Sequence, residues 1–299
     1  MAGEATLGPV LFNWPVEMWR DFYFQIAEEA DVERVYIGEV VCSKRAPLFD
    51  KHIDEVVARL ERAGKKPIFS TLAEVSNALD RLQVKRVATR GETEIEANDV
   101  SALWHLEGRA HDIGPYVNVY NEESLKFFAD KGAQNICLAP ELPASGIAVL
   151  GQVAKDLDVT LEVQVYGRIP LALSARCYHA RAHGLTKDSC KFICDRDDDG
   201  MVLNTLEDEP FLVVNGIQTM SYRCLNLVNE LDELAGFGIS RFRVSPHAAG
   251  TLSVLEVFQS VLDRKTSLDE AHARLQECGL NVPFSNGFYH QRAGIDWRI

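Results

Sequence analysis

Basic residues are scarce in this chain of 299 residues, which has 31 lysines and arginines against 44 aspartates and glutamates. The formal net charge is −13, so the surface should repel polyanions. Phosphate binding needs a basic footprint, which this composition does not provide. We therefore expect neither a nucleic acid nor an anionic membrane surface as a partner.

Long apolar runs are also missing. No uninterrupted hydrophobic stretch is long enough to span a bilayer. The first residues, MAGEATLGPVLFNWP, lack the basic region and long apolar segment of a secretory signal. We expect a cytoplasmic protein, in which the seven cysteines stay reduced and do not form a disulfide framework.

The sequence contains no motif of a common hydrolase. It has neither an HExxH helix for a catalytic zinc nor a GxSxG nucleophile turn. Serine, histidine and aspartate occur, but no short motif arranges them as an activated nucleophile. A peptidase is therefore the least favoured of the functions considered.

Apolar, β-branched runs alternate with amphipathic segments along the chain. Strands are predicted at residues 9–14, 34–41, 66–71, 93–99, 115–121, 134–140, 160–167 and 240–246. Helical patterns begin near Glu17, Ile53, Leu72, Glu122, Ser145 and Leu225. A helix after most strands predicts parallel βαβ units and a (β/α)8 barrel. We expect one α/β domain over residues 1–299, with an irregular insertion at about 168–220 and a C-terminal helical tail.

Three cysteines lie in one polar stretch, ARCYHARAHGLTKDSCKFICDRDDDG, at residues 175–200. Cys190 and Cys194 would share a face if their segment were helical, and Cys177 precedes them in the same insertion. Cys42 directly follows the second predicted strand, in GEVVCSK. Loops after the strands of a (β/α)8 barrel emerge on one face, so Cys42 could meet the other three there. Four thiolates are the ligands of a 4Fe–4S cluster.

The remaining three cysteines have a different setting. Cys137 lies in an apolar strand, whereas Cys224 and Cys278 lie in helical patterns. Each is predicted to be a buried, small hydrophobic residue.

Zinc is an alternative occupant of the polar stretch, because two histidines accompany its cysteines and a site of three cysteines and one histidine is chemically reasonable. The candidate zinc ligands are Cys177, His179, His183, Cys190 and Cys194. The close cysteine pairs of zinc fingers are absent from this stretch, and exposed helix positions would equally explain the histidines. Ligand softness alone does not decide between the two metals.

The aspartates offer a calcium alternative. Residues 195–200, DRDDDG, match the opening of an EF-hand loop with Gly200 at its sixth position. Position twelve is Leu206, however, and the residues that follow Gly200 alternate like a β-hairpin. We therefore expect a turn that leads into a hairpin.

The order of these motifs resembles the bacterial collagenase-like peptidase family, and within it the ubiquinone-biosynthesis branch of UbiU and UbiV. The resemblance covers nearly the whole chain, including the tail NGFYHQRAG at 286–294. Its motifs are GEVVC (38–42), EVQVYGRIPLALSARCYHARAH (162–183), the Cys-x3-Cys pair, DRDDDG and VNGIQTMS (214–221). The gap between Cys177 and Cys190 is somewhat shorter than this branch leads us to expect.

The resemblance implies a 4Fe–4S cluster held by Cys42, Cys177, Cys190 and Cys194. It implies a heterodimer with UbiU that hydroxylates the ring of ubiquinone precursors without molecular oxygen. A lipid-binding protein, UbiT, would assist, and prephenate is the expected oxygen source. A cluster with four cysteine ligands would transfer electrons. The alternative from another class is a zinc-stabilised scaffold without catalytic activity.

Candidate catalytic residues are fewer and weaker. Arg168 and Arg176 lie near the expected barrel mouth with Glu39, and arginine forks suit a carboxylate substrate. His247 follows the eighth predicted strand, where barrel enzymes place catalytic groups. Surface ion pairs and core packing are the competing interpretations. Asn118 and Glu162 are polar strand residues expected to point into the barrel, and the tail residues Tyr289, His290 and Arg292 could cover its mouth or contact a partner.

Overall fold

Short runs of β-branched and aromatic residues form the strands at the centre of the molecule, because such side chains pack well on a pleated, buried surface. The computed structural model describes residues 3–91, 93–106 and 108–298. Within these ranges eight parallel strands form a barrel: β1 (Glu4–Leu7), β2 (Arg34–Ile37), β3 (Lys66–Ser70), β4 (Glu94–Ala97), β5 (His111–Ile113), β6 (Ala133–Cys137), β7 (Thr160–Leu173) and β11 (Arg241–Val244). Strand β11 pairs with both β7 and β1, which closes the barrel and confirms the predicted (β/α)8 fold.

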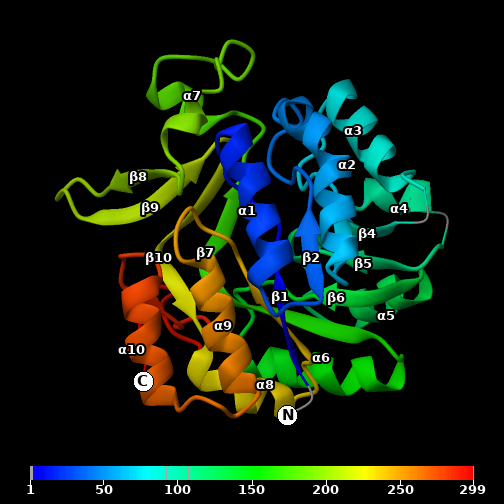
Figure 1. Cartoon of the computed structure of the whole chain (residues 1–299), viewed down its shortest axis with the longest axis vertical. Helices are drawn as coiled ribbons and strands as arrows, with labels where there is room; N and C mark the ends of the chain where they lie inside the picture. The colour runs from blue at the N-terminus through cyan, green and yellow to red at the C-terminus, as the bar shows by residue number, and fades with distance from the viewer. Residues whose placement is uncertain (1–2, 92, 107, 299) are drawn as a thin grey trace.

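The amphipathic segments between the strands form helices around the barrel (Figure 1). They are α1 (Val16–Glu29), α2 (Ala46–Arg62), α3 (Ala78–Ala88), α4 (Ser101–Leu106), α5 (Glu122–Asp130), α6 (Ala144–Asp156), α8 (Leu231–Gly236), α9 (Thr251–Leu262) and α10 (Leu268–Cys278). Two helices begin later than predicted. Asn77 caps α3 in a capping box with Asp80, and residues 225–226 belong to a strand instead of the start of α8.

Two strand predictions were misplaced. The run at 9–14 is a buried loop after β1, since Pro9 cannot donate a ladder hydrogen bond. The run at 115–121 begins with the 3₁₀ turn η1 (Pro115–Val117), and Asn118 then adopts a left-handed φ of 60°. The fifth strand instead comprises His111–Ile113.

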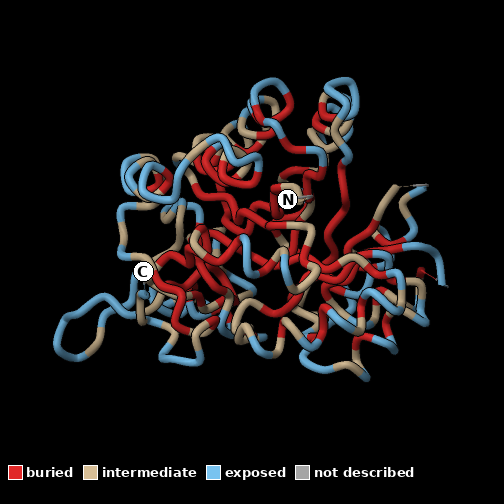
Figure 2. Tube along the Cα trace, turned by 90° about the horizontal axis from the view of Figure 1, so that it is seen from below, coloured by how far each residue is buried: buried red, intermediate tan, exposed pale blue. Residues whose placement is uncertain are grey.

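Strand β7 continues beyond the barrel and carries the insertion. Strand β10 (Gln218–Asn226) pairs antiparallel with this extension, followed outward by β9 (Pro210–Asn215) and β8 (Met201–Asn204). The short β12 (Phe284–Ser285) also pairs with β10. The β8–β9 hairpin projects from the body of the protein, and the exposed loop at its tip is visible in the view from below (Figures 1 and 2). The aspartate run at 195–200 thus leads into a hairpin, as predicted, and not into the second helix of an EF-hand.

The cysteine stretch lies between β7 and this hairpin. It contains the short helix α7 (Tyr178–Ala182) and the 3₁₀ turn η2 (Ile193–Arg196). Cys190 and Cys194 are not on one α-helix, because Lys191 and Phe192 have left-handed φ angles of 51° and 55°. The helical prediction for this segment was therefore wrong.

Figure 2 shows that the centre of the molecule is buried, and the barrel interior there contains charged side chains. Arg243 forms ion pairs with Glu96 and Glu162, at 2.6 and 2.7 Å, and Arg34 pairs with Asp112 at 2.7 Å. All five side chains are buried. Buried charges of this kind are tolerated only when paired and hydrogen-bonded.

No helix in the described ranges is long and apolar enough to cross a membrane. Residues 1, 2, 92, 107 and 299 of the predicted single domain lie outside the described residues.

Candidate metal centre at the barrel mouth

The loop after β2 positions Cys42. Gly38 adopts a φ of 117°, and an added Cβ would meet the Ser70 carbonyl oxygen at 2.8 Å, so the close approach requires glycine. One oxygen of the buried Glu39 then accepts the backbone N–H groups of Val41 and Cys42, at 2.7 and 2.8 Å. The Glu39 carboxylate thereby fixes the backbone that presents Cys42.

The extension of β7 positions the other three cysteines. Two backbone hydrogen bonds, Ser174 to Ile217 at 2.9 Å and His179 to Gly216 at 3.3 Å, attach the start of the stretch to the β9–β10 turn. Cys177 is the N-cap of α7, and its sulfur accepts the Ala180 N–H at 3.4 Å.

Lysine 44 joins the two cysteine-bearing regions. Its Nζ donates to the Lys187 carbonyl at 2.7 Å and to the Cys190 sulfur at 3.4 Å. The insertion after β7 therefore crosses the barrel mouth to the loop after β2. Cys42 and Cys190 are half-buried, whereas Cys177 and Cys194 are buried.

Arginine 45 is the second cation beside the thiols. It is 1% exposed and donates to the Leu11 carbonyl at 3.1 Å and to Asn215 Oδ1 at 3.0 Å. Burial alone would lower its pKa, but Coulombic interactions with Cys194, Glu39 and Cys42 outweigh burial and raise it. Cys42 and Cys194 therefore both lie near the Arg45 guanidinium.

The thiol of Cys177 belongs to the same group. Burial raises the pKa of Cys177, and the neighbouring Cys194 and Cys190 raise it further, whereas Arg45 opposes them. The structure therefore brings the four predicted ligand cysteines together from two distant parts of the sequence.

The sulfur atoms of these four residues are spaced more widely than a zinc ion held by four thiolates requires. Among the described residues, no three cysteine sulfurs lie within 4.8 Å of one another. Tetrahedral zinc, with Zn–S bonds of about 2.3 Å, needs sulfurs only ~3.8 Å apart. The four ligands of a 4Fe–4S cluster bind across a larger group and so lie farther apart. Lys44 and Arg45 would offset part of the thiolate charge.

The other cysteines stand apart from this group. Cys137 and Cys224 are fully buried in β6 and β10, and Cys278 is the half-buried last residue of α10. The helical prediction for Cys224 was wrong, because the residue pairs with Arg168 across the β7–β10 ladder.

The aspartate run has structural partners. Asp197 lies 2.9 Å from His179 Nε2, the Asp198 carbonyl accepts the Trp14 indole N–H at 2.7 Å, and Asp199 accepts the Ala248 N–H at 2.8 Å. These bonds direct the chain into the β8–β9 hairpin.

Of the candidate catalytic residues, His247 and Arg168 are buried near one another. Burial, and next the charge of Arg168, lower the pKa of His247 to about 3, so its ring is neutral near pH 7. Arg168 donates to the Ser221 carbonyl at 3.0 Å, and burial lowers its pKa. Arg176 is exposed on the segment before α7. Catalytic roles for the three residues remain predictions.

The other polar candidates divide between the barrel interior and the outer surface. Glu162 lies inside the barrel, as predicted, whereas Asn118 is exposed and does not point inward. Tyr289 donates to Glu233 at 2.6 Å, and His290 lies 2.9 Å from Glu230, so this part of the tail packs beside α8. Arg292 is exposed.

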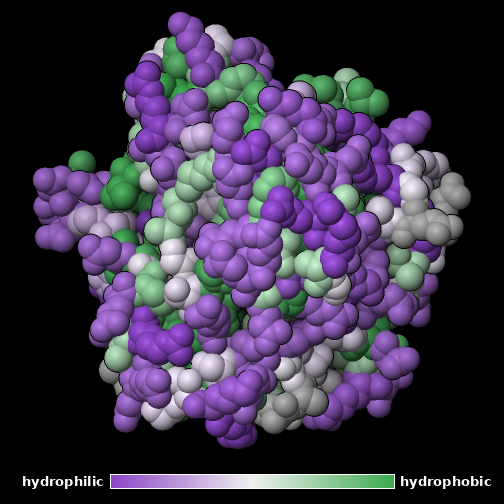
Figure 3. All heavy atoms as spheres, viewed as in Figure 1, coloured by the Kyte–Doolittle hydropathy of each residue, from purple (hydrophilic) through white to green (hydrophobic). Residues whose placement is uncertain are grey.

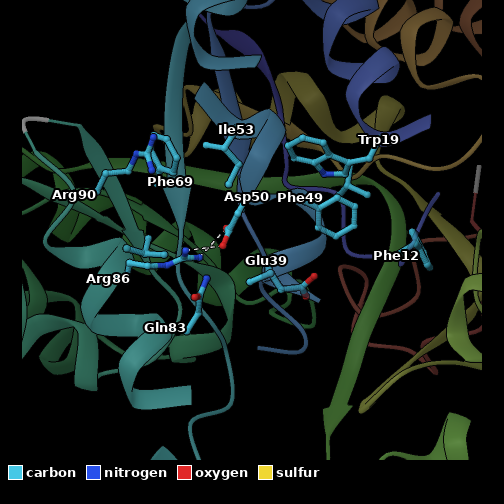
Figure 4. A pocket seen from close by; sticks show the side chains of 14 residues that line it. Phe12, Trp19, Glu39, Phe49, Asp50, Ile53, Phe69, Gln83, Arg86 and Arg90 are labelled. Carbon is cyan, nitrogen blue, oxygen red and sulfur yellow. Dashed lines mark hydrogen bonds and ion pairs between the residues drawn. The ribbon is translucent and has the colours of Figure 1, made fainter. Parts of the chain in front are cut away.

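A narrow cavity of about 40 Å³ lies between α1, α2 and α3, beside Glu39 (Figure 4). An ion pair between Asp50 and Arg86, at 2.6 Å, borders it. This volume holds a few water molecules at most, so the cavity does not accept an aromatic ring.

The sequence did not reveal Lys44, Arg45 or the ionic layer of the barrel. Polar residues alternating with apolar ones within strands, as in RFRV and EIEA, were the available signal for that layer. In a comparison with protein families, the model of peptidase family U32 matches residues 18–298.

Proposed function

Because the chain belongs to peptidase family U32, as the resemblance predicted, we propose that it is a UbiV-like iron–sulfur subunit of an oxygen-independent ring hydroxylase. The observation that carries this proposal is the convergence of Cys42 with Cys177, Cys190 and Cys194 beside two cations. Four thiols gathered beside two cations suit a metal group that takes thiolate ligands.

The family name does not favour peptide hydrolysis by this chain. No hydrogen bond between a serine hydroxyl and a histidine ring joins residues of the described ranges, although several histidines have other partners. The histidine in the loop after β11, His247, is buried and so is not accessible to a peptide. A nucleophile activated by a neighbouring base is therefore not in place.

When bound, a 4Fe–4S cluster would supply one-electron transfer. Cys42, Cys177, Cys190 and Cys194 would hold it. Glu39 keeps the backbone of the Cys42 loop in place through its two N–H contacts. Lys44 and Arg45 add positive charge next to the thiolates, which favours the reduced, more negative state.

The proposed partner is UbiU, and the β8–β9 hairpin supports a protein partner of this kind. Leu206 is fully exposed, and Phe211 and Val202 are 49% and 44% exposed. Figure 3 shows hydrophilic atoms at the projecting tip with hydrophobic patches along the hairpin. Residues 201–215 contain acids but no lysine, arginine or histidine, so the complementary surface should be apolar with a basic rim. Ubiquinone precursors, UbiT and prephenate belong to the same proposal as substrate, lipid carrier and oxygen source.

Anaerobic purification tests the proposal. We expect visible absorption typical of 4Fe–4S proteins and about four irons per chain, both lost in Cys42→Ala. Cys278→Ala, which changes a half-buried cysteine outside the group, is the matched control and should keep its iron. A colourless protein whose cysteines bind zinc would contradict the proposal and favour the zinc-stabilised scaffold.

A further inference from the structure

A second group of potential metal ligands lies beside the cysteines without including any of them. His179, His183 and Asp197 each place one ligand atom within 4.8 Å of the others. The two imidazole rings are stacked, with centroids 5.8 Å apart and an interplanar angle of 21°. His179 Nε2 and Asp197 Oδ2 lie only 2.9 Å apart.

The local fold holds these groups in position. His179 lies in α7 and His183 is its C-cap, four residues later, so both side chains emerge on the same face of one turn. The backbone N–H of His179 donates a hydrogen bond to the Gly216 carbonyl oxygen, and the His179 side chain is completely buried. Asp197 follows the η2 turn and brings its carboxylate to the two rings from the opposite end of the cysteine stretch.

The three groups form a known type of ligand set. Two histidines and one carboxylate hold zinc in open sites, where water completes the coordination. Zinc bonds of about 2.1 Å in a tetrahedral site place ligand atoms ~3.4 Å apart. The present separations, from 2.9 Å to at most 4.8 Å, require movements of less than about 1.5 Å. His183 is exposed, so an ion can reach the group from solvent.

We propose that His179, His183 and Asp197 bind a divalent zinc ion at a site separate from the four cysteines. The ion would join the two ends of the cysteine stretch, since His179 follows Cys177 by two residues and Asp197 follows Cys194 by three. It would thereby keep the stretch folded whether or not the cysteines hold a cluster. This proposal does not depend on the hydroxylase function.

Equilibrium dialysis of the anaerobically purified chain against zinc chloride, followed by metal analysis, tests the site. One zinc per chain is expected in the wild type and in Cys190→Ala. His183→Gln should weaken zinc binding at least about tenfold. Because His183 is exposed, that variant should fold normally. His105→Gln, which changes a half-buried histidine of α4, is the matched control and should bind zinc like the wild type.

X-ray absorption of the zinc-loaded protein identifies the ligand atoms directly. Nitrogen and oxygen neighbours at about 2.0–2.1 Å support the site, whereas sulfur neighbours at about 2.3 Å place the ion on the cysteines and overturn it. Zinc binding that His183→Gln leaves unchanged, or no zinc binding by the wild type, also overturns it. Iron analysis of the same samples tests the cluster separately, so failure of one proposal does not imply failure of the other.

Discussion

The carboxylate of Glu39 accepts the backbone N–H of Cys42 at 2.8 Å, and the same oxygen accepts the N–H of Val41. Glu39 therefore positions Cys42, a ligand of the proposed cluster, by holding the backbone of this residue in place. Glu39→Ala should leave two N–H groups without their acceptor and cost about 1–3 kcal/mol of stability. We expect less iron per chain and a lower Tm.

Glu39→Gln is the control for this prediction, because its amide oxygen can accept the same two hydrogen bonds. Iron content near that of the wild type in Glu39→Gln, with a loss in Glu39→Ala, would identify Glu39 as a positioning residue. Equal iron content in both variants would contradict this role.

Lysine 44 should tune the reduction potential of the proposed cluster. Its ammonium lies 3.4 Å from the Cys190 sulfur, and hydrogen bonds to cluster sulfurs raise the potential. Lys44→Met keeps much of the apolar stem and removes the charge. We expect a potential lower by about 60 mV, a tenfold change in the one-electron equilibrium. Redox titration followed by visible absorption measures it, and Lys51→Met on the exposed face of α2 should leave the potential unchanged.

The ionic layer of the barrel should be sensitive to loss of Arg243. Its guanidinium contacts Glu96 and Glu162, both of which are completely buried. Arg243→Met would leave these carboxylates uncompensated, at a cost of about 3–5 kcal/mol. Urea unfolding measures this loss. Arg264→Met, which breaks an exposed pair with Asp232, should change the free energy of unfolding by about 1 kcal/mol or less.

Asp112 should make stability depend on pH in the acidic range. Burial raises its pKa from 3.8 to about 6, with Arg34 opposing and Glu162 adding to the rise. The folded chain therefore retains a proton that the unfolded chain loses. The resulting stabilisation is complete below about pH 4 and is lost as the pH rises through 6, by up to about 3 kcal/mol.

Glu162 has the opposite effect in a lower range. Burial alone would raise its pKa, but Arg243 outweighs burial and lowers it to about 2, so its stabilisation is lost as the pH falls from 4.5 towards 2. Asp112→Asn should thus flatten the decline in unfolding free energy between pH 4 and 6 and leave the lower range unchanged. Urea unfolding at each pH measures both effects, and an unchanged slope between pH 4 and 6 would contradict the assignment to Asp112.

The hairpin tip should contribute to binding of the proposed UbiU partner. Leu206 is fully exposed in the described structure, so Leu206→Asp should fold normally and place a charge at the apolar contact. We expect at least about tenfold weaker association by calorimetry with purified UbiU. Leu268→Asp, a similar change on exposed α10, is the control. Wild-type affinity in Leu206→Asp would exclude the hairpin from the interface.

The barrel and the clustering of the cysteines followed from local patterns in the sequence. Alternating strands and helices predicted the barrel, and the position of Cys42 after the second strand predicted that it faces the insertion. Local patterns failed where one residue changes the backbone direction. The left-handed Asn118 and the Asn77 cap are such cases, since apolar residues surround both positions.

The contacts of the site were less predictable because they join distant segments. Lys44 reaches Cys190 only because the insertion crosses from β7 to the loop after β2. Arg243 pairs with Glu96 and Glu162 only once the barrel has closed. In the sequence each of these residues is a single polar position, and its partner is set by tertiary structure.

Cys42 and Cys177 are about 135 residues apart along the chain, so a link between them would affect the stability of the folded protein. A metal group bound to both would act as a cross-link that closes a very large loop in the unfolded chain. By chain-entropy arguments, such a link reduces the disorder of the unfolded state by the equivalent of roughly 5 kcal/mol. Most of the barrel, from β3 to β7, lies within that loop. Oxidative loss of the group would therefore lower the resistance of the whole barrel to unfolding and proteolysis, and not only abolish the proposed electron transfer.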